Sequence, residues 1–411
     1  MKLLLRTTLF ILLFIIFQQC DFFFPEEVDP NLLLDGPVDG LTNVQKATFA
    51  EGDEAFGQNF SASTGLGPVF NHIACIACHA GDGKGHPFSN LTRFGKGNSD
   101  NSEEFDYMIE YGGPQLQNRA IPGYESEVLP GDATGVSERS ALIVVGVGFL
   151  EAVSDDTLLA LADPDDDDGD GISGRVNYVN PPDFFVPKSH HISDPYGKYI
   201  GRFGRKAKAI DLLHQTSGAY IDDMGITTDF FTEDLYNPLE GQFTGDNVPD
   251  PEVGSDVVAN VVFYLRTLKP PKPRNQDDPD VMAGDSLFNV IGCAGCHLPT
   301  LTTGFSSVSV LSETEFHPYT DLLLHDMGEE LADYYPEGGA TGTEWRTTPL
   351  WGLGLIQDNL GGIPYYLHDG RTSDLTEVIR LHQGEALQSS DNFDNLSGNE
   401  KEQVLKFLES L

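Results

Sequence analysis

Two stretches of the chain carry apolar residues at the three- and four-residue spacing of an amphipathic helix. One spans Asp256–Leu265 and the other spans Lys401–Leu411. This period predicts two helices, each with one face packed against a core. Two apolar runs, Ala141–Leu150 and Val257–Leu265, are shorter than the roughly 20 residues that a helix needs to cross a bilayer. Both runs are therefore predicted to be core segments.

A third apolar run lies near the N-terminus. It extends from Leu9 to Phe17, follows the basic start Met1–Arg6 and is followed by Cys20. This order is typical of a secretory signal peptide, so residues 1–20 are left out of the fold and the mature chain is predicted to be exported. The cysteine favours lipid attachment, which predicts a membrane-anchored lipoprotein facing the periplasm or the cell surface. Small residues normally precede such a cysteine and are missing here, so ordinary cleavage with a free Cys20 thiol is the alternative.

A short internal repeat divides the rest of the chain. Glu51–Phe56 and Ala283–Phe288 share a Gly-Asp pair and a final Phe, and each precedes a cysteine motif. The proline-rich segment Lys269–Asn275 between them is expected to be a stiff linker. The repeat predicts a tether at 21–45, an N-terminal domain with a large insertion at 46–268, a linker at 269–275 and a C-terminal domain at 276–411.

The cysteine motifs predict the cofactor. Cys75-Ile76-Ala77-Cys78-His79 and Cys293-Ala294-Gly295-Cys296-His297 both have the C-x-x-C-H spacing, at which two thiols form thioethers to a haem and the His ligates its iron. Together they use four of the five cysteines, which chance, zinc or simple redox motifs do not explain. We predict two covalently bound haem c groups with His79 and His297 as proximal ligands.

The fold class follows from the motifs and the helix pattern. A cytochrome c module packs its last helix against its first, so the helices at Asp256–Leu265 and Lys401–Leu411 are expected to close two such modules. The 44 glycines and 25 prolines favour loops around short helices. The predicted fold is mainly α, with two cytochrome c-like haem domains in tandem and loop-rich insertions.

Charge restricts the partners. The formal net charge of −40 argues against nucleic-acid binding. We interpret it as a solvated acidic surface, with electrostatic steering of a basic partner as the alternative.

Several segments around the two motifs resemble the bacterial di-haem cytochrome c peroxidase superfamily, most closely its di-haem oxidoreductase ("thiol oxidoreductase") branch. The resemblance implies a mostly helical fold with one electron-transfer haem and one catalytic haem. It does not identify a substrate, because activity depends on the site and not on the fold. The segments that carry it, in chain order, are Gly65–Asn71, Asp82–Gly85, Gly201–Gly204, Asp223–Thr227, Asp321–Gly328, Glu344–Thr347 and Tyr366–Arg371.

The resemblance also implies a distal pocket at the first haem. In the superfamily, a Gln and a Glu-Met pair that follow a Gly-Arg turn form this pocket, and Gln215 and Asp223-Met224 are the comparable residues here. It implies that Gln215 orients peroxide and that Asp223 is the acid–base group for O–O cleavage. Asp is one methylene shorter than Glu. His214 is an alternative iron ligand, and solvated carboxylates at a helix end are the structural alternative for Asp223.

At the second haem, a sixth ligand would close the iron for electron transfer. Met327 follows the second motif by 30 residues and is the first candidate, with His325 as the alternative. Arg371 lies in a segment that echoes the one before Gln215, so it is a candidate partner of a haem propionate. A surface arginine that caps a turn is the alternative. Trp345 is a candidate for the route between the irons or, more simply, for core packing.

An acidic run suggests a further ion. Asp166, Asp168 and Asp170 precede Gly171 at the alternation of a calcium-binding loop, but Asn177 stands in the twelfth place, where such loops carry Glu. Calcium binding and a solvated loop both remain open.

Three functions compete. The first is a peroxidase-like oxidoreductase, in which a redox partner protein supplies electrons through one haem and peroxide or another small oxidant binds at the other. The second is an electron carrier with both irons six-coordinate and no substrate. The third is a haem enzyme that oxidises an external substrate.

Overall fold

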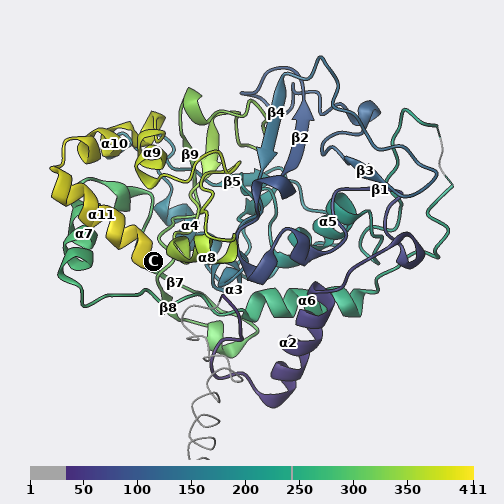
Figure 1. Ribbon diagram of the computed structural model, residues 1–411, viewed down its shortest axis with the longest axis horizontal. Coiled ribbons are helices and arrows are strands. Elements are labelled where there is room, and N and C mark those ends of the chain that lie inside the picture. Colours follow the sequence, from purple (N-terminus) through teal and green to yellow (C-terminus); the bar gives the residue numbers. More distant parts are fainter. Residues whose placement is uncertain (1–33, 242–243) are drawn as a thin grey trace, which may run out of the picture. The chain divides into compact units, whose positions relative to one another are not determined.

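The computed structural model describes residues 34–241 and 244–411 (Figure 1). The predicted signal peptide and Cys20 lie outside these residues. Residues 34–411 form one compact unit. Its first residues pack on the body, because Val38 N donates to Thr267 O at 2.8 Å and the Leu34, Val38 and Leu41 side chains are buried. The division at residues 269–275 stays a prediction.

Two helices pack together in the first half of this unit. Helix α2 (Asn43–Phe56) begins at a capping box formed by Thr42 and Gln45, and it crosses α6 (Ser255–Thr267). The crossing is close, because a Cβ on Gly52 would lie 2.2 Å from the Asn260 carbonyl oxygen. The helix predicted over Asp256–Leu265 is thus confirmed as part of α6.

The second half repeats this arrangement. Helix α7 (Pro279–Val290) packs against α11 (Gly398–Ser410), and the two lie side by side in Figure 1. Here a Cβ on Gly284 would lie 2.0 Å from the Gln403 carbonyl oxygen. Gly52 and Gly284 are the shared glycines of the sequence repeat, so the repeat marks two helix crossings that only glycine permits. The helix predicted over Lys401–Leu411 is confirmed, and it starts three residues earlier.

Apart from α5, which has 13 residues like α6, the other helices are shorter, and long loops join them. They are α3 (Val147–Glu151), α4 (Asp155–Leu161), α5 (Leu212–Met224), α8 (Ile356–Asn359), α9 (Leu375–Arg380) and α10 (Leu387–Asp394). None of the helices within the described residues is long and apolar enough to cross a membrane.

Short strands, which the sequence pattern did not predict, complete the fold. They form five antiparallel two-stranded sheets within the described residues. The pairs are β1 (Val69–Phe70) with β3 (Arg119–Ala120), β2 (Leu91–Gly95) with β4 (Gly135–Arg139), β5 (Asn177–Val179) with β6 (Tyr199–Gly201), β7 (Leu301–Thr302) with β8 (Glu315–Phe316), and β9 (Leu324–Asp326) with β10 (Glu344–Arg346). The fold is therefore mixed and loop-rich, and the prediction of a mainly α protein is confirmed only in part.

Two hydrophobic clusters make up most of the core. The larger surrounds α2, α5 and α6 and takes in residues up to Trp351, and the smaller surrounds α7 and α11. Phe149 and Leu150, at the end of the predicted core run Ala141–Leu150, are buried in the larger cluster. Each cluster supports one of the two cysteine motifs.

Candidate functional site

The two C-x-x-C-H motifs have the same local structure. Each begins with a single 3₁₀ turn, Cys75–Ala77 or Cys293–Gly295, and the backbone N–H of its histidine then donates to the carbonyl of the first cysteine at 3.0 Å. This turn brings two thiols and one imidazole to the wall of a cavity. The first cavity, at Cys75–His79, measures about 240 Å³ and the second, at Cys293–His297, about 260 Å³. Cavity volume therefore does not distinguish a catalytic site from an electron-transfer site.

The proximal histidines are held as neutral imidazoles. Burial lowers the pKa of both His79 and His297 to about 4. His297 Nδ1 donates to the Tyr319 carbonyl at 2.9 Å, which leaves Nε2 available as a metal ligand. Metal-binding histidines commonly use this arrangement. His79 Nδ1 is buried and has no hydrogen-bond partner of normal geometry among the described residues.

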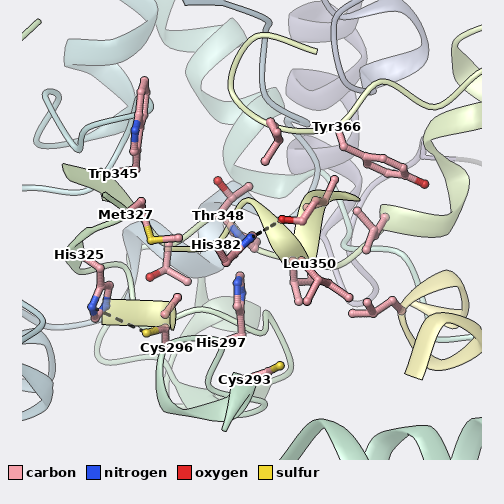
Figure 2. Close-up of a pocket in the computed structure, with 18 of the residues that line it drawn as sticks. Cys293, Cys296, His297, His325, Met327, Trp345, Thr348, Leu350, Tyr366 and His382 are labelled. Carbon is pink, nitrogen blue, oxygen red and sulfur yellow. Dashed lines mark hydrogen bonds between the residues drawn. The ribbon is translucent and has the colours of Figure 1, made fainter. Parts of the chain in front are cut away.

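Two side chains in the second cavity can serve as a sixth ligand. Met327 and His382 line the cavity together with His297 (Figure 2). His382 Nδ1 donates to the Val378 carbonyl at 2.7 Å, and its Nε2 is left available. Met327 is thus brought to the cavity as predicted, but His382, which we had not proposed as a ligand, is an equally placed donor. The echo between the two segments pairs His382 with His214, a candidate ligand at the first haem, and this was the signal in the sequence that could have selected it.

His325, the alternative to Met327, is committed to other partners. Its Nε2 bonds to Asp321 Oδ2 and its Nδ1 to Glu385 Oε2, each at 2.8 Å. Burial alone would lower the pKa of His325, but the hydrogen bonds to these carboxylates raise it to about 12. A doubly protonated imidazole has no lone pair for iron, so this geometry argues against His325 as a ligand.

Helix α5 forms one wall of the first cavity. It begins at Asp211, whose carboxylate accepts from His214 N, and it ends at Gly225, which adopts a left-handed conformation. The residues that line the cavity recur every three or four positions, so they share one face of the helix. They are Leu212, Gln215, Thr216, Ala219, Tyr220, Asp223 and Met224. Gln215 and Asp223 thus reach the same cavity, whereas His214 is not among its lining residues.

The Asp223 carboxyl is half-buried, at a polar corner of this cavity. Burial is the main reason that its pKa rises to about 6, and the Asp222 carboxylate raises it further. Gln115 Nε2 donates to Asp223 Oδ1 at 2.8 Å and opposes this rise. The Asp223 charge also raises the pKa of the Cys75 and Cys78 thiols, which places the carboxyl near the thiol edge of the cavity. Gln115 lies in a loop, and sequence analysis gave no reason to select it.

The two cavities share a wall that carries buried cations. Arg205 and Arg346 line both cavities and Lys84 lines the second, and all three side chains are buried. Arg205 donates to the Ser140 carbonyl, Arg346 to the Gly204 carbonyl and Lys84 to the Ser140 hydroxyl. Within the described residues, none of these three cations forms an ion pair, and burial lowers the pKa of each. The shared residues are Leu142, Ile143, Arg205, Arg346, Thr348, Pro349 and Trp351.

The buried cations of the shared wall indicate whether the two cavities can hold haems. A buried cation without a counter-ion is costly, so such a cluster indicates an anionic ligand. Each haem carries two propionates, and a pair of cavities with a cysteine motif on one side and cations between them suits two haems. The residues present therefore fit the group that the motifs predict.

Comparison with protein families decides the identity. The model of the family described as "Di-haem oxidoreductase, putative peroxidase" matches residues 118–411. The chain belongs to this family. The di-haem oxidoreductase match covers the second motif, α5 and the shared wall, and it starts after the first motif. A search of the curated proteins finds no match.

Two solved structures are similar to this di-haem oxidoreductase. A hydrazine synthase structure from Kuenenia stuttgartiensis has 13% sequence identity and a TM-score of 0.36, with 94% of this chain and 97% of that chain covered. A MauG-like protein associated with microbial copper homeostasis has 19% identity and a TM-score of 0.26, with 40% of this chain and 55% of that chain covered. Both scores are too low to carry an argument about fold or function.

The structure gives Arg371 of this di-haem oxidoreductase a different role from the predicted one. Its Nε donates to Asp369 Oδ2 at 2.7 Å and its Nη1 to the Glu330 carbonyl at 3.0 Å. Arg371 lines neither cavity, so the geometry supports the surface alternative. The cations available to propionates are instead those of the shared wall.

Trp345 lines the second cavity and is buried against charged and aromatic groups. Its ring stacks on His368 with centroids 4.0 Å apart, and Lys206 Nζ lies 4.5 Å from its centroid. Its Nε1 donates to the Leu331 carbonyl at 2.9 Å. These contacts give Trp345 a packing role, and its place on an electron route stays a prediction.

The aspartates of the acidic run do not come together in the grouping Asp166, Asp168 and Asp170 that the sequence predicts. Asp166 and Asp168 come together with Asp163, whereas Asp170 is not part of the group. Asp170 Oδ1 accepts from Ile172 N at 2.8 Å, and Asp166 Oδ1 accepts from Gly171 N at 3.1 Å. Because the loop's own N–H groups satisfy these oxygens, the contacts favour a solvated loop over a calcium site.

Proposed function

We propose that this di-haem oxidoreductase reduces a peroxide in the first cavity with electrons that enter through the second. One observation carries the proposal. Helix α5 presents an amide, Gln215, and a half-buried carboxyl, Asp223, to the same cavity as Cys75, Cys78 and His79. An acid–base group with a pKa near the working pH is what O–O cleavage requires.

In the first cavity, Cys75 and Cys78 would hold a haem through thioethers and His79 would ligate its iron. When bound, the haem supplies the electron-accepting and electron-donating chemistry at the peroxide. The reaction consumes two electrons and two protons for each hydrogen peroxide and releases two waters. Asp223, as a carboxylate, accepts a proton from one peroxide oxygen and returns it to the other as the O–O bond breaks. The Gln215 amide donates a hydrogen bond that orients the peroxide.

In the second cavity, Cys293, Cys296 and His297 would bind the second haem in the same way. Met327 or His382 would be available as a further ligand of its iron, which would suit electron transfer and exclude peroxide. The electrons come from a redox partner protein, which we propose docks outside the second cavity.

A second candidate function is an electron carrier in which both haem irons are six-coordinate. One observation favours it: Met224, the last residue of α5, also lines the first cavity and is only 2% exposed. A Met ligand there would leave no position for peroxide.

Spectroscopy and one matched pair of variants separate the two. The holoprotein should show a high-spin haem in the oxidised or the half-reduced state and should consume hydrogen peroxide. Asp223→Asn should lower turnover by about 10²- to 10⁴-fold, the usual contribution of general acid–base catalysis, without loss of haem. Asp222→Asn is the control, because Asp222 is adjacent but does not line the cavity. Since the Asp222 carboxylate raises the pKa of Asp223, this variant should move the pH profile to lower pH but keep the turnover. Two low-spin haems in every redox state, with no consumption of peroxide, would support the carrier instead. Normal turnover by Asp223→Asn would remove Asp223 from the mechanism.

We also propose that the protein is exported and held at a membrane by lipid on Cys20. Cys20→Ala should release it from the membrane fraction into the soluble exported fraction. Retention of the variant in the membrane would reject the anchor and leave the peroxidase proposal intact.

A further inference from the structure

A second group of acidic side chains lies away from both cavities, where α5 ends and α6 begins. Ligand atoms of Asp234, Asp250 and Glu252 lie within 4.8 Å of one another. Asp246 is next to them in the fold, because a Cβ on the preceding Gly245 would lie only 3.1 Å from Asp234 Oδ2, and the Asp246 charge acts on Asp234. We call these four residues the acidic junction.

Several oxygens of the acidic junction are buried and have no partner. Asp234 Oδ1, Asp246 Oδ2 and Glu252 Oε1 accept no hydrogen bond from the described residues. Asp246 is decisive because its side chain is buried, with the residue only 5% exposed, and only Oδ1 is used, by Val248 N at 2.7 Å. An unpartnered, buried carboxylate oxygen is costly unless a ligand satisfies it.

The surroundings do not supply the missing positive charge. In the part of the chain that the structure describes, no lysine or arginine is among the main groups that shift the pKa of Asp234, Asp246 or Glu252. The pKa of Asp234 rises to about 6 and that of Glu252 to about 7, chiefly through burial and then, for Asp234, through the Asp250 charge. A proton shared by Asp250 and Glu252 would neutralise only one of four charges and would leave the Asp246 oxygen without a partner.

The acidic junction is also held in place by the fold. The buried Thr227, just after α5, donates its hydroxyl to Asp250 Oδ1 at 2.8 Å and its N–H to Glu252 Oε2 at 2.7 Å. Glu252 in turn packs on Gly65, where a Cβ would lie 2.0 Å from its Cγ. Gly65 has a φ of +95°, so a side chain there is doubly excluded. Asp250 is exposed and gives an ion access from solvent.

We propose that the acidic junction is a calcium site. It offers only oxygen ligands, which hard cations prefer, and it draws them from separate points of an irregular loop. Calcium accepts six to eight such ligands in flexible geometry, whereas magnesium retains its waters and uses one or two carboxylates. A bound ion would join the end of α5, which lines the first cavity, to the start of α6.

Equilibrium dialysis of the holoprotein with radioactive calcium tests this proposal. The protein is first freed of metal with a chelator and then dialysed at about 1 mM free calcium, the upper end of the range for extracellular calcium modules. Glu252→Gln and Asp246→Asn, which preserve side-chain size, should each bind one calcium fewer per chain than the wild type. Asp166→Asn is the matched control, because it removes a carboxylate from the other acidic group, and it should not affect this ion.

Thermal unfolding provides a second readout. Calcium should raise the unfolding temperature of the wild type, and this rise should be lost in Glu252→Gln and Asp246→Asn, whose haem spectra stay normal. The proposal is overturned if the wild type binds no calcium, if magnesium binds equally well, or if the variants retain wild-type stoichiometry and the same thermal shift. These outcomes are independent of peroxide turnover.

Discussion

The helix crossings at the repeated glycines lead to a sharp prediction about stability. Gly284→Ala should destabilise the protein although alanine favours helix. The new Cβ would lie 2.0 Å from the Gln403 carbonyl oxygen and 2.7 Å from Phe407 Cβ. Because real Cβ contacts begin near 3.0 Å, α7 and α11 must separate by about 1 Å.

The loss of stability can be worked out from the packing that is disturbed when α7 and α11 move apart. The α7–α11 interface buries apolar side chains that are each worth about 1.5–3 kcal/mol. A gap of about 1 Å forfeits a quarter to a half of the attraction between facing atoms. Over five side chains, the loss is about 2–7 kcal/mol, from which about 1 kcal/mol of helix propensity is recovered. The net decrease in the free energy of unfolding should be about 1–6 kcal/mol. The side chains concerned are Val281, Phe288, Val404, Phe407 and Leu408.

Urea unfolding of the holoprotein, followed by circular dichroism, measures this decrease. Gly218→Ala is the matched control, because Gly218 is also helical and a Cβ there meets nothing within 4 Å. The control should gain about 0.5–1 kcal/mol. Gly52→Ala should behave like Gly284→Ala, since its Cβ would lie 2.2 Å from the Asn260 carbonyl. If Gly284→Ala proves as stable as Gly218→Ala, the close crossing does not exist in solution and the reasoning fails.

Three further predictions concern the sites. Peroxide turnover should fall as pH drops through about 6, because the Asp223 carboxylate becomes protonated. The residual activity of Asp223→Asn should not show this acidic decrease. If the variant keeps the same decrease, Asp223 is not part of the mechanism. The folded-state pKa of His325 is raised to about 12, so its stabilising effect is complete below its unfolded pKa and is lost as pH rises toward 12. The wild type should therefore lose up to about 1.4 kcal/mol per pH unit between about pH 7 and 10, and His325→Gln should lose less; parallel pH curves would contradict the Asp321–His325–Glu385 arrangement. Met327→Leu should convert the second haem from low to high spin in absorption spectra, and an unchanged spectrum would assign the ligand to His382.

The helix pairs and both motifs were predictable because their signals are local. An apolar period identifies a helix, and C-x-x-C-H specifies its own chemistry within five residues. The repeated Gly-Asp pair marked the two halves, but its physical meaning, a close helix crossing, needed coordinates. Gln215 and Asp223 were selected through a resemblance, and their common helical face explains why both reach one cavity.

The shared wall was not predictable because its residues come from distant parts of the chain. Arg346 lies in a segment that carries the family resemblance, but only the structure reveals that Arg205 and Arg346 are buried without carboxylate partners. Arg371 was selected by an echo between segments, and in the structure it pairs with Asp369, two residues away. An echo between segments does not indicate which arginine is buried beside a cavity.

The shared wall has a consequence for how variants of this protein are interpreted. Arg205 and Arg346 line both cavities, so their two charges contribute to the electrostatic potential in both cavities at once. A substitution at either arginine should therefore shift the reduction potentials of both centres. Reductive titrations of such variants should follow both centres, because a shift at one centre is expected to come with a shift at the other.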